Sequence, residues 1–238
     1  MTSARADWGK SVLTVLRIFA RRGSSDDHQH SDMDELTYER EYAAKGFLAV
    51  AGVDEVGRGP LAGPVVCAAV ILPLGEEKCI AGINDSKKLS AKKREELAAL
   101  IRERARAYAI EEVSNEVIDE INILQATRLC MKRAVEKLST AADMVLTDGN
   151  MTLDIEAPQR SIVKGDALVA SIGAASILAK VYRDALMREY AKLYPEYAFE
   201  RNAGYGTAAH IAAIREVGIC PIHRRTFVTK FWDGKLRN

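Results

Sequence analysis

The apolar residues of this chain gather in short runs of strand length, separated by longer segments in which apolar residues recur at helical spacing. The first two runs cover residues 47–53 and 65–72, and the second is rich in β-branched residues and bounded by prolines. Shorter runs at 108–113, 143–147 and 160–163 have the same character. The pattern therefore predicts five strands.

Four other segments predict helices: 36–45, 90–107 with Ser90 as the N-cap, 123–138 and 166–193. Apolar residues three or four apart form one stripe in the third of them, at Ile123, Ala126, Cys130, Ala134 and Leu138. Two adjacent strands come first, and strands then alternate with helices. We therefore expect an α/β fold with a mixed β-sheet flanked by helices and a helical C-terminal part.

The first 35 residues have a different character from the rest. Apolar residues in 8–22 stand among basic ones, and a polar stretch follows. We interpret 1–35 as an N-terminal extension that is either flexible, a short basic amphipathic helix or a targeting peptide, with Met33 as an alternative start. Residues 36–238 are long enough for one substantial domain.

Composition narrows the class of protein. Of the 238 residues 48% are hydrophobic and 28% are charged, which is typical of a globular cytoplasmic protein. No apolar run reaches the roughly 18 residues that a membrane-spanning helix needs. The four cysteines are far apart, so neither a zinc site nor a disulfide framework is indicated, and Cys67 and Cys130 are expected to be buried. The net charge is +1, but the last 38 residues are basic, which is compatible with a phosphate-rich partner.

Carboxylates follow two of the predicted strands. Asp54 and Glu55 end the first strand and would point to opposite faces of a flat strand, so both can serve one site only if the chain bends. Gly57 and Gly59 make such a bend plausible. Asp148 ends the run at 143–147 just before a glycine. Oxygen ligands without histidine or cysteine suit Mg²⁺ or Mn²⁺, and a pair of such ions would support phosphodiester hydrolysis.

A fourth carboxylate is needed for such a site, and the sequence offers Asp166 or Asp184. Both lie on the helix predicted at 166–193 and face the same direction, but they would stand roughly 27 Å apart along its axis, so only one can join the cluster. Asp166 begins the helix, where an acid also suits the helix dipole and could merely be a cap. The choice stays open on these grounds.

Two other classes of protein deserve weighing. The glycines at 57, 59 and 63 superficially resemble the loop of a dinucleotide-dependent oxidoreductase, but that motif needs a following helix, and here Pro60, Pro64 and Val65 favour another strand. A non-catalytic nucleic-acid-binding module would need only the basic C-terminus. Clustered carboxylates would weaken phosphate binding without a metal ion, which argues against that class.

The chain as a whole resembles the ribonuclease HII family. The matching segments follow the family order over about residues 36–230: 53–64 (VDEVGRGPLAGP), 84–90 (NDSKKLS), 147–149 (TDG), 164–166 (KGD), 174–184 (AASILAKVYRD), 204–207 (GYGT) and 223–227 (HRRTF). Any one motif could arise by chance, but the ordered set is specific. The resemblance covers the predicted domain at 36–238, which would be the catalytic domain, and it implies a ribonuclease H-like fold.

The resemblance also implies an activity. It indicates an endonuclease that hydrolyses the RNA strand of RNA/DNA hybrids and cuts 5′ of single ribonucleotides in duplex DNA, leaving 3′-hydroxyl and 5′-phosphate ends. Two Mg²⁺ or Mn²⁺ ions would be held by Asp54, Glu55, Asp148 and Asp166, and Asp184 would be structural. The residues implied to bind substrate are Gly57, Arg58 and Gly59 at the 2′-hydroxyl, Ser86, Lys87 and Lys180 near phosphates, and Tyr205 at the following deoxyribose. The two lysines also fit a solvated surface.

A few features bear on partners and on departures from the family. Gly173 stands where alanine is expected, and a glycine inside a helix costs roughly 1 kcal/mol relative to alanine, so it should soften the helix without removing chemistry. No clamp-binding peptide is evident after Phe231. We expect a monomer that binds hybrid and ribonucleotide-containing duplexes, with no membrane contact for the catalytic domain.

Overall fold

The computed structural model describes residues 36–75, 80, 82–83, 89–232 and 234. Every described residue belongs to one compact unit, 34–238. The predictions for the segment 1–35, and those for Ser86 and Lys87, lie outside the described residues.

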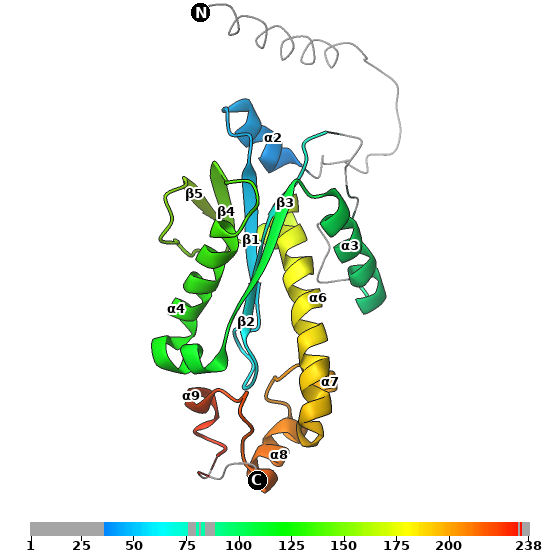
Figure 1. Ribbon diagram of the computed structural model, residues 1–238, viewed down its shortest axis with the longest axis vertical. Coiled ribbons are helices and arrows are strands. Elements are labelled where there is room, and N and C mark those ends of the chain that lie inside the picture. Colours follow the sequence, from blue (N-terminus) through cyan, green and yellow to red (C-terminus); the bar gives the residue numbers. More distant parts are fainter. Residues whose placement is uncertain (1–35, 76–79, 81, 84–88, 233, 235–238) are drawn as a thin grey trace, which may run out of the picture. The chain divides into compact units, whose positions relative to one another are not determined.

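Five strands form one sheet in the order β3-β2-β1-β4-β5 (Figure 1). Their bounds are β1 Val50–Val56, β2 Val65–Ile71, β3 Ala107–Val113, β4 Met144–Asp148 and β5 Gln159–Ile162. The strands β1, β2 and β3 pair antiparallel, whereas β1, β4 and β5 pair parallel. The predicted mixed sheet is confirmed.

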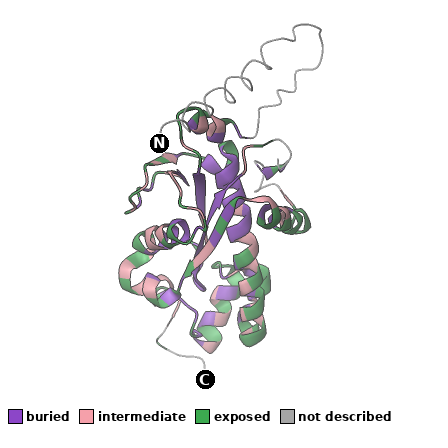
Figure 2. Cartoon of the chain, turned by 45° about the horizontal axis from the view of Figure 1, so that its top comes forward, coloured by how far each residue is buried: buried purple, intermediate pink, exposed green. Residues whose placement is uncertain are grey.

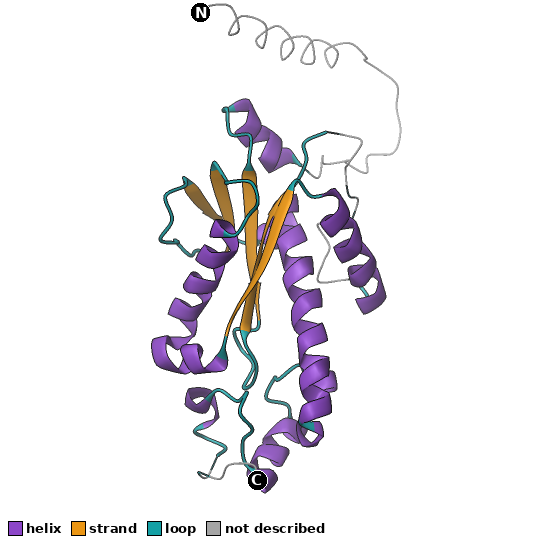
Figure 3. Cartoon of the chain, in the orientation of Figure 1, coloured by secondary structure: helices purple, strands orange, loops and turns teal. Residues whose placement is uncertain are grey.

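Helices flank this sheet and follow it (Figure 3). Their bounds are α2 Thr37–Ala44, α3 Ala91–Arg104, α4 Asn115–Glu136, α5 Gly165–Leu168, α6 Ala170–Leu193, the 3-10 turn η3 Pro195–Tyr197, α7 Phe199–Asn202, α8 Ala208–Val217 and α9 Arg225–Val228. The predicted helical C-terminal part is confirmed. Within the described ranges, no helix combines the length and the apolar character needed to cross a membrane.

Alternating side chains of β2 bury the two faces of the sheet against different helices. Val65 and Cys67 join one core cluster with Ala126, Cys130 and Ala134 of α4, so the predicted apolar stripe is confirmed. The intervening residues of β2 pack with α3 and α6 in a second cluster. Figure 2 shows buried residues running through the sheet and along the inner sides of these helices. The sheet is therefore covered by helices on both faces.

The first strand is shifted relative to the prediction, which placed it at 47–53. The backbone amides of Leu48 and Ala49 donate to the carboxylate of Asp143, so they are not available to a strand ladder. The antiparallel ladder with β2 instead continues to Val56, opposite Val66. Asp54 and Glu55 consequently lie inside β1 rather than at its end.

The predicted helix at 166–193 is two helices, α5 and α6, separated by Val169 in an extended conformation (φ −124°, ψ 117°). The assumption that Asp166 and Asp184 share one straight helix was therefore wrong. The helix predicted at 123–138 begins earlier, at Asn115, after the N-cap Ser114. A kink at Asn122 (φ 65°, ψ 163°) divides it, which hid its first turns from a search for helical periodicity.

The segment after Gly57, Gly59 and Gly63 settles the question of a dinucleotide loop. It leads into strand β2 rather than into a helix, so the helix that a dinucleotide-binding loop requires is missing there. The oxidoreductase alternative is therefore excluded by the fold.

Candidate active site

A cavity of about 390 Å³ opens where β1 and β4 end, between helices α3 and α6. Its lining combines acidic, basic and hydroxyl side chains: Asp54, Glu55, Val56, Arg94, Asp148, Ser176, Ile177 and Lys180. Three of the four predicted carboxylates thus reach one cavity, together with one of the predicted lysines.

Strand register explains why Asp54 and Asp148 meet. The parallel ladder of β1 and β4 ends with the pair Val53 and Thr147. Asp54 and Asp148 each follow the last paired residue, so the two acids are neighbours across adjacent strands at the same edge. This is the type of strand end at which sites of α/β proteins form.

Asp54 lies where a negative charge is unfavourable. Its side chain is buried on the α6 side, where Ser176 forms a hydrogen bond to it, and the amide of Glu55 donates to its Oδ1 at 2.8 Å. Burial, followed by the negative charges of Glu55 and Asp148, raises the pKa of Asp54 to about 8. Its carboxylate therefore lacks sufficient positive charge nearby, and a bound cation would remedy that.

Glu55 does not share the direction of Asp54. The register stays regular through Val56, so the side chains of Asp54 and Glu55 leave the strand in opposite directions, although both reach the lining of the cavity at the strand end. The expected bend comes only after the two acids, at Gly57 with φ +93°. Arg58 forms an ion pair with Glu55 at 3.3 Å, although burial still raises the pKa of Glu55 overall.

Asp148 is held by the chain that leads to Asp166. Its Oδ1 accepts a hydrogen bond of 2.7 Å from the amide of Gly165, which follows Lys164 in the left-handed conformation (φ 60°). Asp166 is the next residue and is buried, with 5% of its surface exposed. It is not among the residues that line the cavity, but the bond from Gly165 holds the preceding residue against Asp148.

In the part of the chain that the structure describes, no three acidic, histidine or cysteine side chains converge tightly enough to enclose a metal ion. Asp54 and Glu55 leave β1 in opposite directions, and Asp166 is not in the lining of the cavity. The carboxylates are neighbours, but their side chains do not converge on a single metal position.

Two helices each contribute a basic side chain to the lining of the cavity. Lys180 of α6 lies in the lining and pairs with Asp184 at 2.6 Å, which gives Asp184 a structural contact. Arg94 of α3 also lines the cavity, and its Nη2 donates to the carbonyl of Leu89 at 2.9 Å. The sequence analysis missed Arg94. The run of basic residues directly after the N-cap Ser90 was the available signal.

The predicted sugar-reading residues are also neighbours. An added Cβ at Gly59 would lie 3.5 Å from Cε1 of Tyr205, although 146 positions separate them in the chain. Tyr205 is 45% exposed, and Arg58 and Gly59 are exposed as well. Arg58 also joins this surface to the cavity through its ion pair with Glu55. The loop and the tyrosine therefore form one accessible surface beside the carboxylates.

Neighbouring acids beside basic side chains suit a phosphodiester substrate and a divalent cation, so the fold and the site define a nuclease of the ribonuclease H-like class. Comparison with known proteins refines this class. A family model described as ribonuclease HII matches residues 51–230. The chain belongs to the ribonuclease HII family.

Individual proteins that are similar to this chain carry names of the same family. Ribonuclease HII of Endomicrobium trichonymphae is 58% identical over 193 residues, which are 81% of this chain and 91% of that protein. The crystal structure of ribonuclease H2 from Pyrococcus horikoshii matches with a TM-score of 0.66 and 27% identity, covering 75% of this chain and 93% of that one. The structure of a PCNA:RNase HII complex from Archaeoglobus fulgidus matches with a TM-score of 0.65 and 25% identity, over 79% and 98% of the chains.

Family membership fixes the coarse activity. The protein is a ribonuclease H endonuclease that acts on nucleic acid and cleaves the RNA strand of RNA/DNA hybrids. Activity in this family depends on divalent metal ions.

Proposed function

We propose that the enzyme cuts the phosphodiester bond on the 5′ side of a ribonucleotide, including a single ribonucleotide embedded in duplex DNA. Water attack there would leave a 3′-hydroxyl on the upstream strand and a 5′-phosphate on the ribonucleotide. The observation that carries the proposal is the adjacency of two surfaces: a cavity with acids and cations, and an exposed loop at Gly59 beside Tyr205. The first suits phosphodiester chemistry, and the second suits recognition of a sugar.

Asp54, Glu55, Asp148 and Asp166 would hold two divalent ions, Mg²⁺ or Mn²⁺. The raised pKa of Asp54 supports this fit, because a buried acid beside two other acids gains most from a nearby cation. The ligand set consists of oxygen atoms, which suits these metals. Bound ions would activate the attacking water and stabilise the leaving oxygen.

The chain's own residues prepare the site for the substrate. The Gly165 amide fixes one oxygen of Asp148 and leaves the other for the cavity. Lys180 of α6 and Arg94 of α3 line the cavity and would contact phosphate oxygens of the substrate. Their positive charges would offset the repulsion between a phosphodiester and the acids.

Discrimination of the sugar would come from the loop Gly57-Arg58-Gly59 and from Tyr205. The 2′-hydroxyl distinguishes RNA from DNA, and a glycine-flanked loop lets main-chain atoms approach it closely. Tyr205 would pack against the deoxyribose that follows the ribonucleotide. Its contact with Gly59 would make the two recognition steps adjacent, as a junction between RNA and DNA requires.

The direct test compares four labelled duplexes in the presence and absence of Mg²⁺: an RNA/DNA hybrid, a DNA duplex with one ribonucleotide, an all-DNA duplex and an all-RNA duplex. The proposal expects cutting of the first two, only with the metal. Binding without cutting under every condition would instead favour a non-catalytic nucleic-acid-binding module.

A further inference from the structure

Two arginine side chains, Arg183 in α6 and Arg224 just before α9, are completely buried. An isolated guanidinium is costly to remove from water, so a buried arginine normally pairs with a carboxylate. Among the residues described here, no carboxylate lies within ion-pairing distance of either one. Burial lowers the pKa of Arg224 to about 9, so it still carries its charge at neutral pH. Two positive charges therefore lie inside the fold without a described carboxylate in direct contact, although Asp184 and Asp119 act on them from farther away.

Both guanidinium groups donate to main-chain carbonyls instead. Arg183 donates to Pro64, Ala203 and Ala62 at 3.0, 2.9 and 3.1 Å. Arg224 donates to Gly63, Arg58 and Gly57 at 3.0, 2.9 and 2.5 Å. Five of these six acceptors belong to the segment 57–64, which contains the predicted sugar-reading loop. The planar guanidinium suits this task because its donors are fixed in one plane.

Glycines allow the segment to lie against the arginines. Gly57 (φ +93°) would place a Cβ 2.3 Å from Nε of Arg183, and Gly63 (φ +84°) would place one 2.6 Å from Sδ of Met187 and 3.3 Å from Nη2 of Arg183. Gly59 is different, because its nearest neighbour in that direction is Tyr205 at ordinary contact distance. The first and third glycines therefore serve the packing, whereas Gly59 faces the substrate side.

The hydrogen bonds also fix where the loop amides point. In a trans peptide the N–H of one residue points opposite to the carbonyl of the residue before it, and no described peptide bond is cis. The carbonyls of Gly57 and Arg58 face Arg224. The amides of Arg58 and Gly59 therefore point outward, and neither has an acceptor among the described residues.

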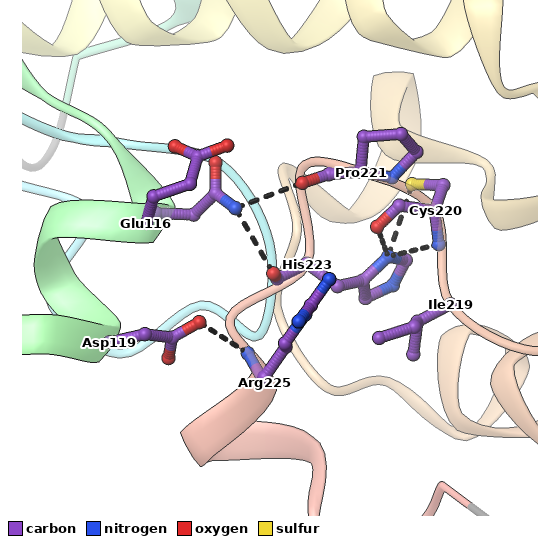
Figure 4. Close-up of a pocket in the computed structure, with 8 residues that line it drawn as sticks. Glu116, Asp119, Ile219, Cys220, Pro221, His223 and Arg225 are labelled. Carbon is purple, nitrogen blue, oxygen red and sulfur yellow. Dashed lines mark hydrogen bonds between the residues drawn. The ribbon is translucent and has the colours of Figure 1, made fainter. Parts of the chain in front are cut away.

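Helix α4 holds the backbone on both sides of Arg224 (Figure 4). Asn115 donates through Nδ2 to the carbonyl of His223 at 3.2 Å, and Asp119 accepts from the amide of Arg225 at 2.8 Å. The amide of Arg224 donates to the carbonyl of Leu61 at 2.8 Å. These bonds fix the backbone of Arg224, from which its side chain extends to the loop.

We propose that Arg183 and Arg224 are positioning residues: Arg224 turns the carbonyls of Gly57 and Arg58 inward, and Arg183 holds the end of the same segment and packs against Gly57. Together they present the Arg58 and Gly59 amides to an oxygen atom of the substrate. The inference rests on the proposed role of this loop in reading the 2′-hydroxyl. It predicts that selection of a ribonucleotide depends on two residues that do not touch the substrate.

Amide hydrogen exchange of the wild-type protein tests the geometry without any variant. We expect rapid exchange at Arg58 and Gly59, slow exchange at Leu61 and Gly63, whose amides donate to Gly204 and Ile222, and protection of the first two when a single-ribonucleotide duplex is added in EDTA. Slow exchange at Arg58 and Gly59 in the free protein would overturn the proposal. This result does not depend on whether the protein cuts such a duplex.

Lysine variants test the consequence for specificity. Arg183→Lys and Arg224→Lys keep the charge but cannot reach three carbonyls from one nitrogen centre. We expect kcat/KM on the single-ribonucleotide duplex to fall about tenfold more than on a long hybrid, which corresponds to about 1.4 kcal/mol. Exchange at Leu61 and Gly63 should also accelerate. Arg188→Lys is the matched control, because Arg188 lies in the same helix but is exposed.

Equal losses on the two substrates in folded lysine variants would reduce both arginines to stability residues and overturn the proposal. If a lysine variant does not fold, the exchange pattern of the wild-type loop still decides. If the wild-type enzyme leaves the single-ribonucleotide duplex intact, the proposed function fails, and the exchange data judge the loop geometry separately.

Discussion

Gly165 donates its amide hydrogen to Oδ1 of Asp148 at 2.7 Å, and this bond joins the end of β4 to the turn that carries Asp166. The relationship matters because Asp148 is the acid that the register places beside Asp54. One oxygen of Asp148 is thus occupied by the fold, and the other is available to the cavity. The site is assembled by a strand edge and a turn that are 17 residues apart.

Asp148→Asn should abolish most cleavage without unfolding the protein, because it removes a charged oxygen with little change in volume. We expect kcat to fall by at least about a hundredfold, since even outer-shell changes at metal sites cost 10–100-fold. Asp154→Asn is the matched control, because Asp154 is an exposed acid that pairs with Lys132. Substantial Mg²⁺-dependent turnover by the Asp148 variant would remove this residue from the metal site.

The pKa of Asp54 predicts how the metal-free protein responds to pH. Its folded-state pKa of about 8 lies above the ordinary value of 3.8, so its contribution to stability is present at low pH and is lost as pH rises through that window. Asp54→Asn should therefore raise the melting temperature of the metal-free protein at pH 8, by about 2–4 °C for each kcal/mol gained.

Addition of Mg²⁺ should reverse this order, because the ion stabilises the wild-type protein and finds fewer ligands in the Asp54→Asn variant. Thermal melts at pH 5 and pH 8, each with and without the metal, separate the two effects. If the variant is less stable than the wild type in EDTA at pH 8, the charged form of Asp54 does not destabilise the metal-free protein, and this explanation is wrong.

Tyr205→Ala should lower activity on a single-ribonucleotide duplex about tenfold more than on a long hybrid, a difference of about 1.4 kcal/mol. The reason is that only the single-ribonucleotide duplex always places a deoxyribose beside the tyrosine. Tyr108→Ala, at an exposed tyrosine of β3, serves as the control. Equal losses of kcat/KM on both substrates would refute a junction-sensing role for Tyr205.

A buried histidine pair predicts loss of stability in acid. The Cys220 amide donates to Nδ1 of His223, so the proton of His223 lies on Nε2 and is donated to Nε2 of His210 at 3.0 Å. His210 in turn donates from Nδ1 to the carbonyl of Tyr205 at 2.9 Å. Both rings are therefore neutral, and protonation of either would break this chain of bonds.

Burial lowers the pKa of His223 to about 3, with the nearby His210 as a second cause, and burial also lowers the pKa of His210. Below the unfolded value of about 6.5 the unfolded chain therefore binds more protons than the folded protein, so stability falls as the pH is lowered; protonation of His223 alone should remove about 1.4 kcal/mol of stability per pH unit. Urea titrations at pH 7, 6 and 5 measure this slope. A slope that is unchanged in His223→Gln would exclude this residue as its source.

Patterns along the chain predicted the sheet well, because strand runs and turn residues are local signals. The boundaries of β1 and α6 were wrong for non-local reasons. Asp143 binds the amides of Leu48 and Ala49, almost a hundred residues away in the chain, and Val169 interrupts the helix just after Gly165 bonds to Asp148. Neither effect changes the spacing of hydrophobic residues, so the periodicity could not predict it.

The site was predictable where it depends on strand ends and not where it depends on packing. The places of Asp54 and Asp148 follow from their strands, whereas the places of Arg94, Arg183 and Arg224 depend on contacts that only the fold creates. Gly173 also gains a different explanation from helix softening. A Cβ there would lie 2.9 Å from Ile83 and 3.0 Å from the Asp166 carbonyl, so glycine permits close packing against that turn.

Cleavage mapping on a DNA duplex with one ribonucleotide tests the central claim most directly. With Mg²⁺ present, the account predicts one cut on the 5′ side of the ribonucleotide, with a 3′-hydroxyl on the upstream DNA and a 5′-phosphate on the ribonucleotide. Omission of the metal should prevent the cut, and an all-DNA duplex should stay intact. A cut on the 3′ side, or a metal-independent cut that leaves a cyclic phosphate, would contradict the account.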